Sequence, residues 1–297
     1  MSSFEVVCLG IITIDTISLV DKYPGEDERV LAKQIIRAGG GPAAVAAVTL
    51  SRLGVSTAIA GTIGEDQDGA EVLRIFAREG VDTSGISIGT NATSGSVIVA
   101  SLESSSRAIS TRQPMQQVAL NSAAKKLISE AKWLHVDHVG VTQLQSEKIT
   151  RGGGPKISFD AGYNVAEFDS SQVDLFVPTD KQMELRFPGL ELAAAVERDA
   201  INSKNVTVAT QGSSGSTGYS NESGLVHADG FKVDVVSTLG AGDVFHGALL
   251  AQVIQGYNLA DSLVRANAVA ALSCRGLDGQ SMIPNTSELN TFLKEKS

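Results

Sequence analysis

Two periodicities alternate along this chain of 297 residues. Short apolar runs rich in β-branched residues, typical of buried parallel strands, recur between stretches with helical spacing of apolar positions. The predicted strands are Glu5–Ile12, Thr57–Gly61, Trp133–Val136, Lys156–Phe159, Leu175–Val177 and Val206–Thr210, and the predicted helices include Gly69–Glu79, Asn121–Ala131 and Glu191–Asn202. This alternation predicts βαβ units, and therefore an α/β fold of three layers with a mostly parallel central sheet.

Two segments depart from this alternation. Residues 16–37 and 94–113 carry polar and apolar residues in turn without helical period, which is typical of exposed antiparallel strands. This length fits one large α/β domain or two small ones, and we predict that the two segments form a small sheet attached to one domain that spans residues 1–297.

Composition narrows the class of partner. The formal net charge is −9 and no long basic run occurs, which disfavours nucleic-acid binding and favours small-molecule partners. The N-terminal apolar run lacks a basic flank and reaches Asp15, which argues against a signal peptide or membrane span and predicts a cytoplasmic protein. Cys8 and Cys274 show no metal-ligand spacing, and we expect both to be reduced, packed thiols.

Two glycine clusters carry candidate chemistry. In "AGGGPAAVAAVTLSRLG", from residue 38, three glycines precede Pro42, whose ring suits the first position of a helix that Gly54 would end. In "VDVVSTLGAGDVFHGALLAQVIQGY", from residue 233, an apolar extended run ends at Ser237 and a helix over Gly242–Gln255 follows. Both clusters predict bare backbone close to a ligand.

The second cluster has the features of a phosphoryl-transfer site. Gly240, Ala241 and Gly242 would let backbone amides and a helix N-terminus meet an anionic group. Asp243 does not suit phosphate binding, but it suits a general base that takes a proton from an attacking hydroxyl. From the residues alone, the alternative that Asp243 only caps the helix and the glycines only form a tight turn stays open.

These motifs resemble those of the ribokinase-like sugar kinases, the PfkB family. "STLGAGD" is similar to the family's Asp-Thr-x-Gly-Ala-Gly-Asp signature, and "TQGSSG" to its Thr-x-Gly-x-x-Gly nucleotide loop. "CLGIITIDTISLVDKYPGED" resembles the opening of ketohexokinases, and "GGGPAA" with "FKVDVV" and "GAGDVFHGAL" resembles bacterial sulfofructose kinases. The resemblance extends over nearly the whole chain.

The resemblance implies a ribokinase-like fold whose small sheet is a lid that closes over the sugar and pairs two subunits as a homodimer. It implies ATP and Mg²⁺ as cofactors, Asp243 as catalytic base, and an anion hole at Gly240, Ala241 and Gly242. It places Asp15 and the backbone of Gly39, Gly40 and Gly41 at the sugar. The nucleotide-binding residues that it implies are Thr210, Gly212, Gly215, Thr238, Asn267, Ala270 and Ala271.

Departures from the family pattern suggest where this protein differs. Ser237 replaces the first Asp of the signature, which weakens the expectation of a monovalent-cation site. Thr179 and Gln182 stand where Asn and Glu organise metal-bound water, with Asp180 or Glu184 as candidate replacements, so the sequence leaves the metal ligands unknown.

The sugar-gripping motif Gly-Gly-Asn-x-x-Asn reads Gly-Gly-Pro-Ala-Ala-Val at Gly40–Val45, which removes two amide side chains. We therefore expect Arg29, Arg107 and Arg112, all in the lid segments, to hold an anionic group on the substrate. Solvated arginines or pairing with neighbouring acids is the alternative.

The function that follows is ATP-dependent phosphorylation of a primary hydroxyl on a small sugar or anionic sugar derivative, ketohexose-like or sulfofructose-like. A nucleoside or polyol kinase of the same fold and a catalytically weak ligand-binding relative are the alternatives. Asp160 could contact substrate or metal, or cap the next turn. His246 is expected to pack beneath its helix, and Trp133 to belong to the core.

Overall fold

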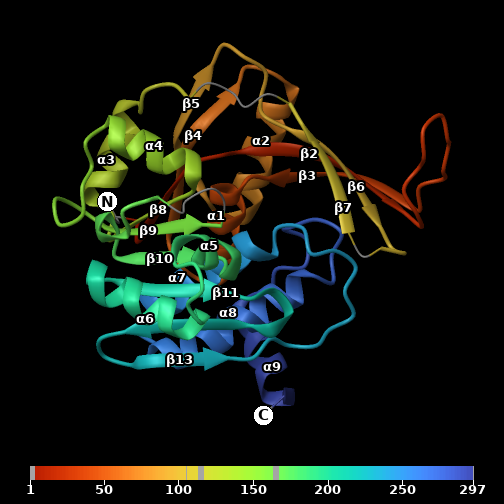
Figure 1. The fold of residues 1–297 in the computed structure, drawn as a ribbon. Helices are drawn as coiled ribbons and strands as arrows, with labels where there is room; N and C mark the ends of the chain where they lie inside the picture. Colours follow the sequence, from red (N-terminus) through yellow and green to blue (C-terminus); the bar gives the residue numbers. More distant parts are fainter. Residues whose placement is uncertain (1–3, 105, 113–116, 163–166, 297) are drawn as a thin grey trace.

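The computed structural model of the chain describes residues 4–104, 106–112, 117–162 and 167–296. Its larger sheet has nine strands in these ranges, in the spatial order β13-β12-β11-β10-β9-β8-β1-β4-β5 (Figure 1). These strands are β1 (Val6–Leu9), β4 (Thr57–Gly64), β5 (Asp82–Gly89), β8 (Trp133–Val136), β9 (Lys156–Ala161), β10 (Leu175–Pro178), β11 (Val206–Thr210), β12 (Ser216–Ser220) and β13 (Gly224–Ala228).

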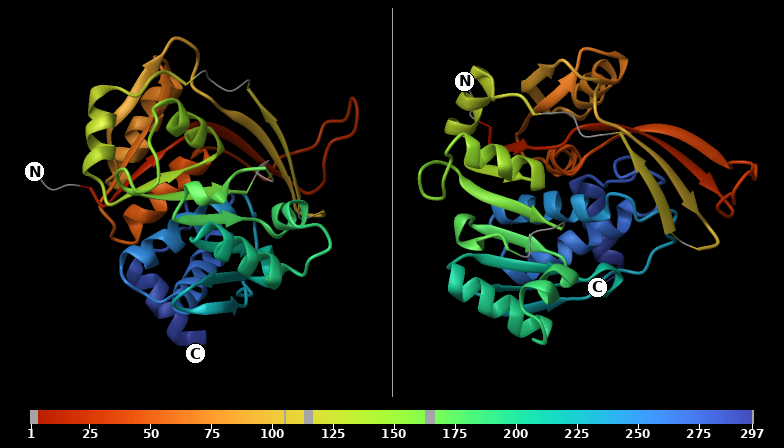
Figure 2. Two further views of the ribbon diagram at one scale, coloured as in Figure 1. Left: turned by 60° about the vertical axis from the view of Figure 1, so that its left-hand side comes forward. Right: turned by 45° about the horizontal axis from the view of Figure 1, so that its top comes forward.

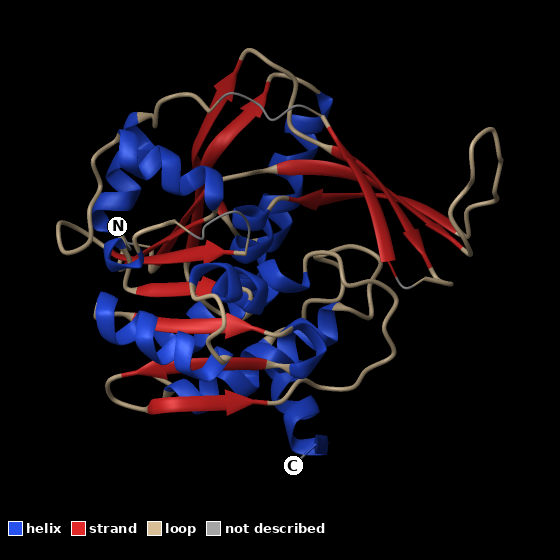
Figure 3. Ribbon diagram, in the orientation of Figure 1, coloured by secondary structure: helices blue, strands red, loops and turns tan. Residues whose placement is uncertain are grey.

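Helices cover both faces of this sheet, as Figure 3 shows. One core joins the sheet to α1 (Pro42–Arg52), α2 (Gln67–Glu79), α7 (Ala241–Ile254), α8 (Leu259–Ser273) and α9 (Thr286–Lys296). A second core lies against α3 (Ser122–Glu130), α4 (His138–Ser146), α5 (Asp180–Arg186) and α6 (Leu192–Ser203). The predicted three-layer α/β fold is therefore confirmed.

The strands between β5 and β11 in this order run parallel, whereas β12 and β13 add an antiparallel edge. β1 and β4 are buried along their whole length, because helices pack on both of their faces. Trp133 in β8 belongs to the core, as expected, and the free cysteines Cys8 and Cys274 are buried. In the described part of the chain, no helix is long and apolar enough to cross a membrane.

The smaller sheet is the lid, with strand order β3-β2-β6-β7. Its strands are β2 (Thr13–Val20), β3 (Gln34–Gly40), β6 (Ser96–Ser101) and β7 (Ser106–Thr111). β2 follows the carboxyl end of β1 and β6 follows that of β5, so the lid leaves the large sheet on the carboxyl side of its strands (Figure 2). Ligands of open α/β sheets bind on that side, next to the strand where the order reverses, which here is β1.

Three sequence-based boundaries need correction. The first strand ends at Leu9 instead of Ile12, because the Ile11 amide donates to the Asp137 carboxylate rather than to a neighbouring strand. Residues 21–33 of the first lid segment are a loop between β2 and β3, and residues 105 and 113 of the second segment lie outside the described residues. The expected extended run Val233–Val236 is not a strand, since residues 229–240 form a loop that leaves Val235 exposed.

Candidate active site

Asp243 lies in the first turn of α7, and the residues before it form a tight entry to the helix. Gly240 caps α7 in the left-handed conformation (φ 73°), and a Cβ there would lie 2.8 Å from the Gly279 Cα. A Cβ on Gly242 would meet no atom within 4 Å, so the backbone there faces open space. The first amides of a helix lack intrahelical acceptors, so this turn can offer donors and a positive dipole end to an anion.

A pocket of about 320 Å³ opens directly beside this turn. Its lining includes every residue that the family resemblance implies for the nucleotide, here called the nucleotide-motif residues: Thr210, Gly212, Gly215, Thr238, Asn267, Ala270 and Ala271. Ala241 and Gly242 line it as well, so the nucleotide-motif residues and the start of α7 share one cavity. Phe231, Val233, Val235 and Phe245 also line it, and the sequence did not single them out for this role.

Packing explains why two residues of this pocket have their identities. Gly215 has φ 98°, and a Cβ there would lie 2.0 Å from the Ala228 carbonyl oxygen, so only glycine fits between β12 and the end of β13. The Asn267 amide nitrogen donates to the carbonyls of Ala228 (2.9 Å) and Asp229 (3.3 Å), and its oxygen accepts from Ser216 (3.2 Å). Asn267 thus ties α8 to the strand ends that bound the pocket.

The base of the lid holds the second set of predicted residues. Asp15 is buried, and its carboxylate accepts from Thr13 Oγ1 (3.1 Å) and from the Ser96 amide (2.9 Å). Burial raises the pKa of Asp15. A Cβ on Gly40 would lie 2.1 Å from the Asp15 carboxylate and one on Gly41 (φ 95°) 2.4 Å from the Ile11 carbonyl oxygen. The glycines at this point are therefore required by close packing around Asp15.

Gly39 faces the loop after α8. A Cβ there would lie 3.1 Å from the side-chain amide of Gln280, so this glycine also sits in a close contact. Gly279, the neighbour of Gln280, is the residue that crowds Gly240. The loop after α8 therefore packs against both glycine clusters.

The three lid arginines lie in three different environments, and their binding of an anionic group stays a prediction. Arg29 lies exposed in the loop between β2 and β3, away from the lid strands. Arg107 of β7 donates from Nη1 to Thr238 Oγ1 (3.1 Å) and lines the nucleotide-side pocket. Arg112 follows β7 and donates to the Thr93 carbonyl (2.8 Å) at the base of the lid. The three arginines therefore differ in their hydrogen-bond partners and in the part of the lid segments from which they come.

Asp243 is half-buried and has an unusual ionisation. Burial raises its pKa to about 8, and the carboxylates of Asp160 and Asp137 act in the same direction, whereas His246 and Arg107 oppose them. A carboxylate with a pKa near the working pH can accept a proton and release it again, which is what a general base requires.

Asp137 is a buried acid that the sequence analysis missed. Its carboxylate accepts from the amides of Ile11 (2.7 Å), Val139 (2.9 Å) and Gly140 (2.8 Å), and so it joins the end of β1 to the start of α4. Burial raises its pKa. The signal that could have found it is an acid directly after a predicted parallel strand, the same pattern that singled out Asp160.

Asp160 and His246 form a second buried pair. Asp160 Oδ1 accepts from the Gly162 amide (3.1 Å), and its Oδ2 lies 2.7 Å from His246 Nδ1. His246 packs beneath α7 as expected. No local pattern could have paired these residues, since they lie on elements far apart in the sequence.

The residues discussed for metal binding are engaged elsewhere or exposed. Thr179 caps α5 by accepting from the Gln182 amide (3.2 Å), and the Asp180 carboxylate accepts from the Lys181 amide (2.7 Å). Among the described residues, no group of three or more His, Cys, Asp or Glu side chains is placed to hold a metal ion. The side chains described here therefore do not fit a metal held by the protein alone.

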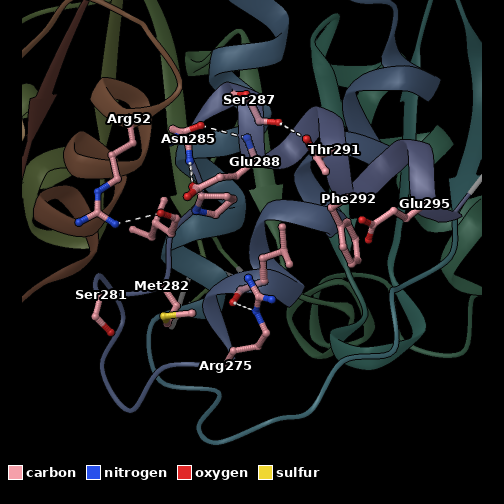
Figure 4. A pocket seen from close by; sticks show the side chains of 13 residues that line it. Arg52, Arg275, Ser281, Met282, Asn285, Ser287, Glu288, Thr291, Phe292 and Glu295 are labelled. Atoms are coloured by element: carbon pink, nitrogen blue, oxygen red, sulfur yellow. Dashed lines mark hydrogen bonds between the residues drawn. The ribbon is translucent and has the colours of Figure 1, made fainter.

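A separate cavity of about 610 Å³ lies beside α9 (Figure 4). Two of its charged groups are already engaged: Arg52 makes two hydrogen bonds to Glu79 and donates to the carbonyls of Gln280 and Ile283, and Glu288 accepts from the Asn285 amide. None of the motif residues lines it. The α7 pocket is therefore the candidate active site.

An acid at a helix N-terminus, a pocket beside it and a smaller four-stranded sheet are the features expected of a ribokinase-like phosphotransferase. The model of the pfkB family of carbohydrate kinases matches residues 3–152 and 165–286. The chain belongs to this family, and it is accordingly an ATP-dependent carbohydrate kinase that phosphorylates a sugar hydroxyl.

Individual relatives are distant but cover the whole chain. The ATP-dependent ribose-1-phosphate kinase of Halopiger xanaduensis is 25% identical over 98% of this chain and 99% of its own length. The ketohexokinase of Mus musculus is 26% identical over 94% and 99%. Among solved structures, the ribokinase of Arabidopsis thaliana complexed with ribose and ATP superimposes with a TM-score of 0.80 at 18% identity, over 99% of both chains. This last likeness supports the fold alone.

Proposed function

We propose that this protein transfers the γ-phosphate of ATP to a primary hydroxyl of a small sugar or anionic sugar derivative, with Asp243 as general base. The observation that carries the proposal is the position of Asp243 in the first turn of α7, beside the pocket that holds all seven nucleotide-motif residues. Asp15 and the Gly39–Gly41 backbone at the base of the lid would hold the sugar hydroxyls.

The proposed chemistry uses each part of this site. Asp243 takes the proton of the attacking hydroxyl as that oxygen bonds to the γ-phosphorus and the bond to the ADP leaving group breaks. The amides at Gly240, Ala241 and Gly242, with the helix dipole, offset the charge on the transferred group. Mg²⁺ would arrive on the ATP phosphates with most of its water ligands, which is its usual mode of binding in kinases.

The charge of the sugar is the open part of the proposal. One relative is named as a kinase of a phosphorylated sugar and another, of nearly equal sequence identity, as a ketohexokinase. Sequence identity therefore does not distinguish an anionic from a neutral substrate. We propose an anionic derivative, because Pro42 and Val45 offer no side-chain hydrogen bonds where amides would grip a neutral sugar. Arg112 is the arginine best placed to meet the anion, since the neighbouring Thr111 pairs with Ser96, whose amide donates to Asp15.

We also propose a homodimer through the outer face of the lid. Ile35 on β3 (66% exposed) and Val97 on β6 (57% exposed) lie on one face of this sheet, on either side of β2. Val97→Asp should convert a dimer to a monomer in light scattering. Ile201→Asp on α6, also half exposed, is the control and should leave the mass unchanged. A monomeric wild-type protein would overturn this proposal.

The test of the main proposal is a panel of neutral, phosphorylated, carboxylated and sulfonated ketoses and aldoses with ATP, read by ADP release and by ³¹P NMR of the product. We expect a phosphate ester at a primary carbon and a higher kcat/KM for an anionic sugar than for fructose or ribose. Asp243→Asn should lower kcat at least about a hundredfold. Turnover unchanged in that variant would overturn the role of Asp243, and a preference for fructose would overturn the anionic class.

A further inference from the structure

His246 occupies a closed site between three strands and α7. It lies three residues after Asp243 in α7, and its exposed fraction is only 4%. Nε2 is 3.1 Å from the Val177 carbonyl oxygen of β10, and Nδ1 is 2.7 Å from Oδ2 of Asp160 on β9. Both ring nitrogens therefore face oxygen atoms rather than solvent.

This geometry favours a charged ring. A carbonyl oxygen and a carboxylate oxygen both accept hydrogen bonds, whereas a neutral imidazole carries only one N–H. Oxygen atoms close to both nitrogens favour a ring that carries both protons, the imidazolium. Burial opposes that charge, but the Asp160 carboxylate outweighs it and the pKa of His246 is raised, while the pKa of Asp160 is lowered.

The other charged groups near His246 come from several elements. Asp243 on α7 and Asp137 after β8 are carboxylates, Asp160 is the direct partner, and Arg107 reaches the same region from the lid. His135 on β8 has its ring centroid 6.4 Å from that of His246. Burial, together with the charge of His246, lowers the pKa of His135 to about 4, so His135 adds no second cation.

We propose that His246 is a positioning residue for phosphoryl transfer: a buried imidazolium that offsets the carboxylates of Asp160 and Asp137 and so allows Asp243 to act as an ionised base. The inference rests on the proposed function, because it assigns His246 a role toward that base. Without the imidazolium, the buried carboxylates of Asp243, Asp160 and Asp137 would repel one another. Ionisation of Asp160 would then make ionisation of Asp243 less favourable.

The charge state can be measured without any enzymatic reaction. The chain has four histidines, so ¹⁵N-histidine labelling gives few ring signals, and the signal lost in His246→Gln identifies His246. We expect that signal in the unliganded wild-type protein to keep the imidazolium pattern at about pH 8, well above the ordinary histidine pKa of about 6.5. A neutral ring at about pH 7 would overturn the proposal.

The second measurement is the pH profile of kcat/KM with the best sugar of the panel. His246→Gln keeps an amide donor for the Val177 carbonyl but removes the charge, and we expect its acid limb to move up by about one pH unit. Asp160→Asn should move that limb in the opposite direction, and the double variant should return it close to the wild-type position. His227→Gln, on the exposed edge strand β13, is the matched control and should leave the profile unchanged.

These outcomes separate the inference from the proposed function. If His246 only filled space, its variants would lower kcat/KM at every pH without moving the limb, and the inference would fail while Asp243 kept its role. If wild-type protein gave no phosphorylated sugar, or if Asp243→Asn kept full turnover, the proposed function would fail instead. Should His246→Gln fail to fold, the ring signal of the wild-type protein, identified by its persistence as pH rises, still decides the charge state.

Discussion

Arg107 Nη1 donates a hydrogen bond to Thr238 Oγ1 over 3.1 Å, which joins lid strand β7 to the loop that leads into Asp243. The two residues are 131 positions apart in the sequence. Arg107 also lines the nucleotide-side pocket with Ala241 and Gly242, and its charge opposes the rise in the Asp243 pKa. A cation at this point would meet the transferred phosphoryl group rather than a distant part of the sugar.

Arg107→Ala should therefore lower kcat/KM by about tenfold to a hundredfold for neutral and anionic sugars alike, because it removes charge stabilisation common to both. Arg107→Lys should recover part of the loss, since it restores the charge but not the planar fork. Steady-state kinetics with both sugar classes provide the measurement. Arg29→Ala, which alters only an exposed loop arginine, is the control. If Arg107→Ala lowered kcat/KM for anionic sugars alone, Arg107 would bind the sugar rather than the transferred phosphoryl group.

Asp243 should make the wild-type protein less stable at alkaline pH. The folded-state pKa of about 8 lies above the ordinary Asp value of about 3.9, so between these values the folded state holds a proton that the unfolded state has lost. The free energy of unfolding therefore falls as pH rises from about 4 to about 8.

Because an asparagine side chain carries no charge at any of these pH values, Asp243→Asn should have nearly the wild-type Tm at about pH 4 and a Tm at least about 2 °C higher at about pH 8.5. Calorimetry without nucleotide is the appropriate measurement. A Tm difference that does not change with pH would show that the carboxylate ionises normally in the folded protein.

Gly40→Ala should weaken sugar binding selectively. The added Cβ would lie 2.1 Å from the Asp15 carboxylate and 2.6 Å from Thr13 Oγ1, so Asp15 must leave its hydrogen bonds to make room. We expect the KM for sugar to rise at least about tenfold with little change in the KM for ATP. Gly154→Ala, where a Cβ would meet no atom within 4 Å, is the matched control. A rise in both KM values would mean that Gly40 supports the whole site rather than the sugar.

Potassium should activate this protein little. Ser237 stands where a carboxylate would help to build the cation site implied by the family resemblance, and its Oγ accepts from the Leu239 amide (3.1 Å). The nearby Asp278 carboxylate is already an acceptor for the amides of Gln280 and Ser281.

Replacing KCl by tetramethylammonium chloride at constant ionic strength should change kcat by less than about twofold, because a neutral hydroxyl binds a hard cation weakly. Ser237→Asp provides the comparison and should gain potassium dependence. A severalfold potassium-specific activation of the wild-type protein would contradict this prediction.

Much of the architecture was predictable because it depends on local patterns. Fully apolar runs such as Val6–Leu9 can only be buried strands in a chain of this alternation, and the helix at Pro42–Arg52 begins at its proline as predicted. The nucleotide-motif residues also came from sequence signatures, and the fold brings all seven into one pocket. The strand and helix predictions concern residues within one element, where nearby chemistry decides the conformation, whereas the nucleotide-motif residues were implied by the family resemblance.

Tertiary structure alone decided which of these residues meet. The sequence determined that Asp243 follows a glycine turn, but the pairing of Asp160 with His246 depends on β9 and α7 packing together. The separation of Arg29 from Arg107 likewise depends on where β2 ends and which strands pair in the lid. Charge interactions act through space, so the ionisation of a catalytic acid follows from neighbours that only the folded chain brings within a few ångströms.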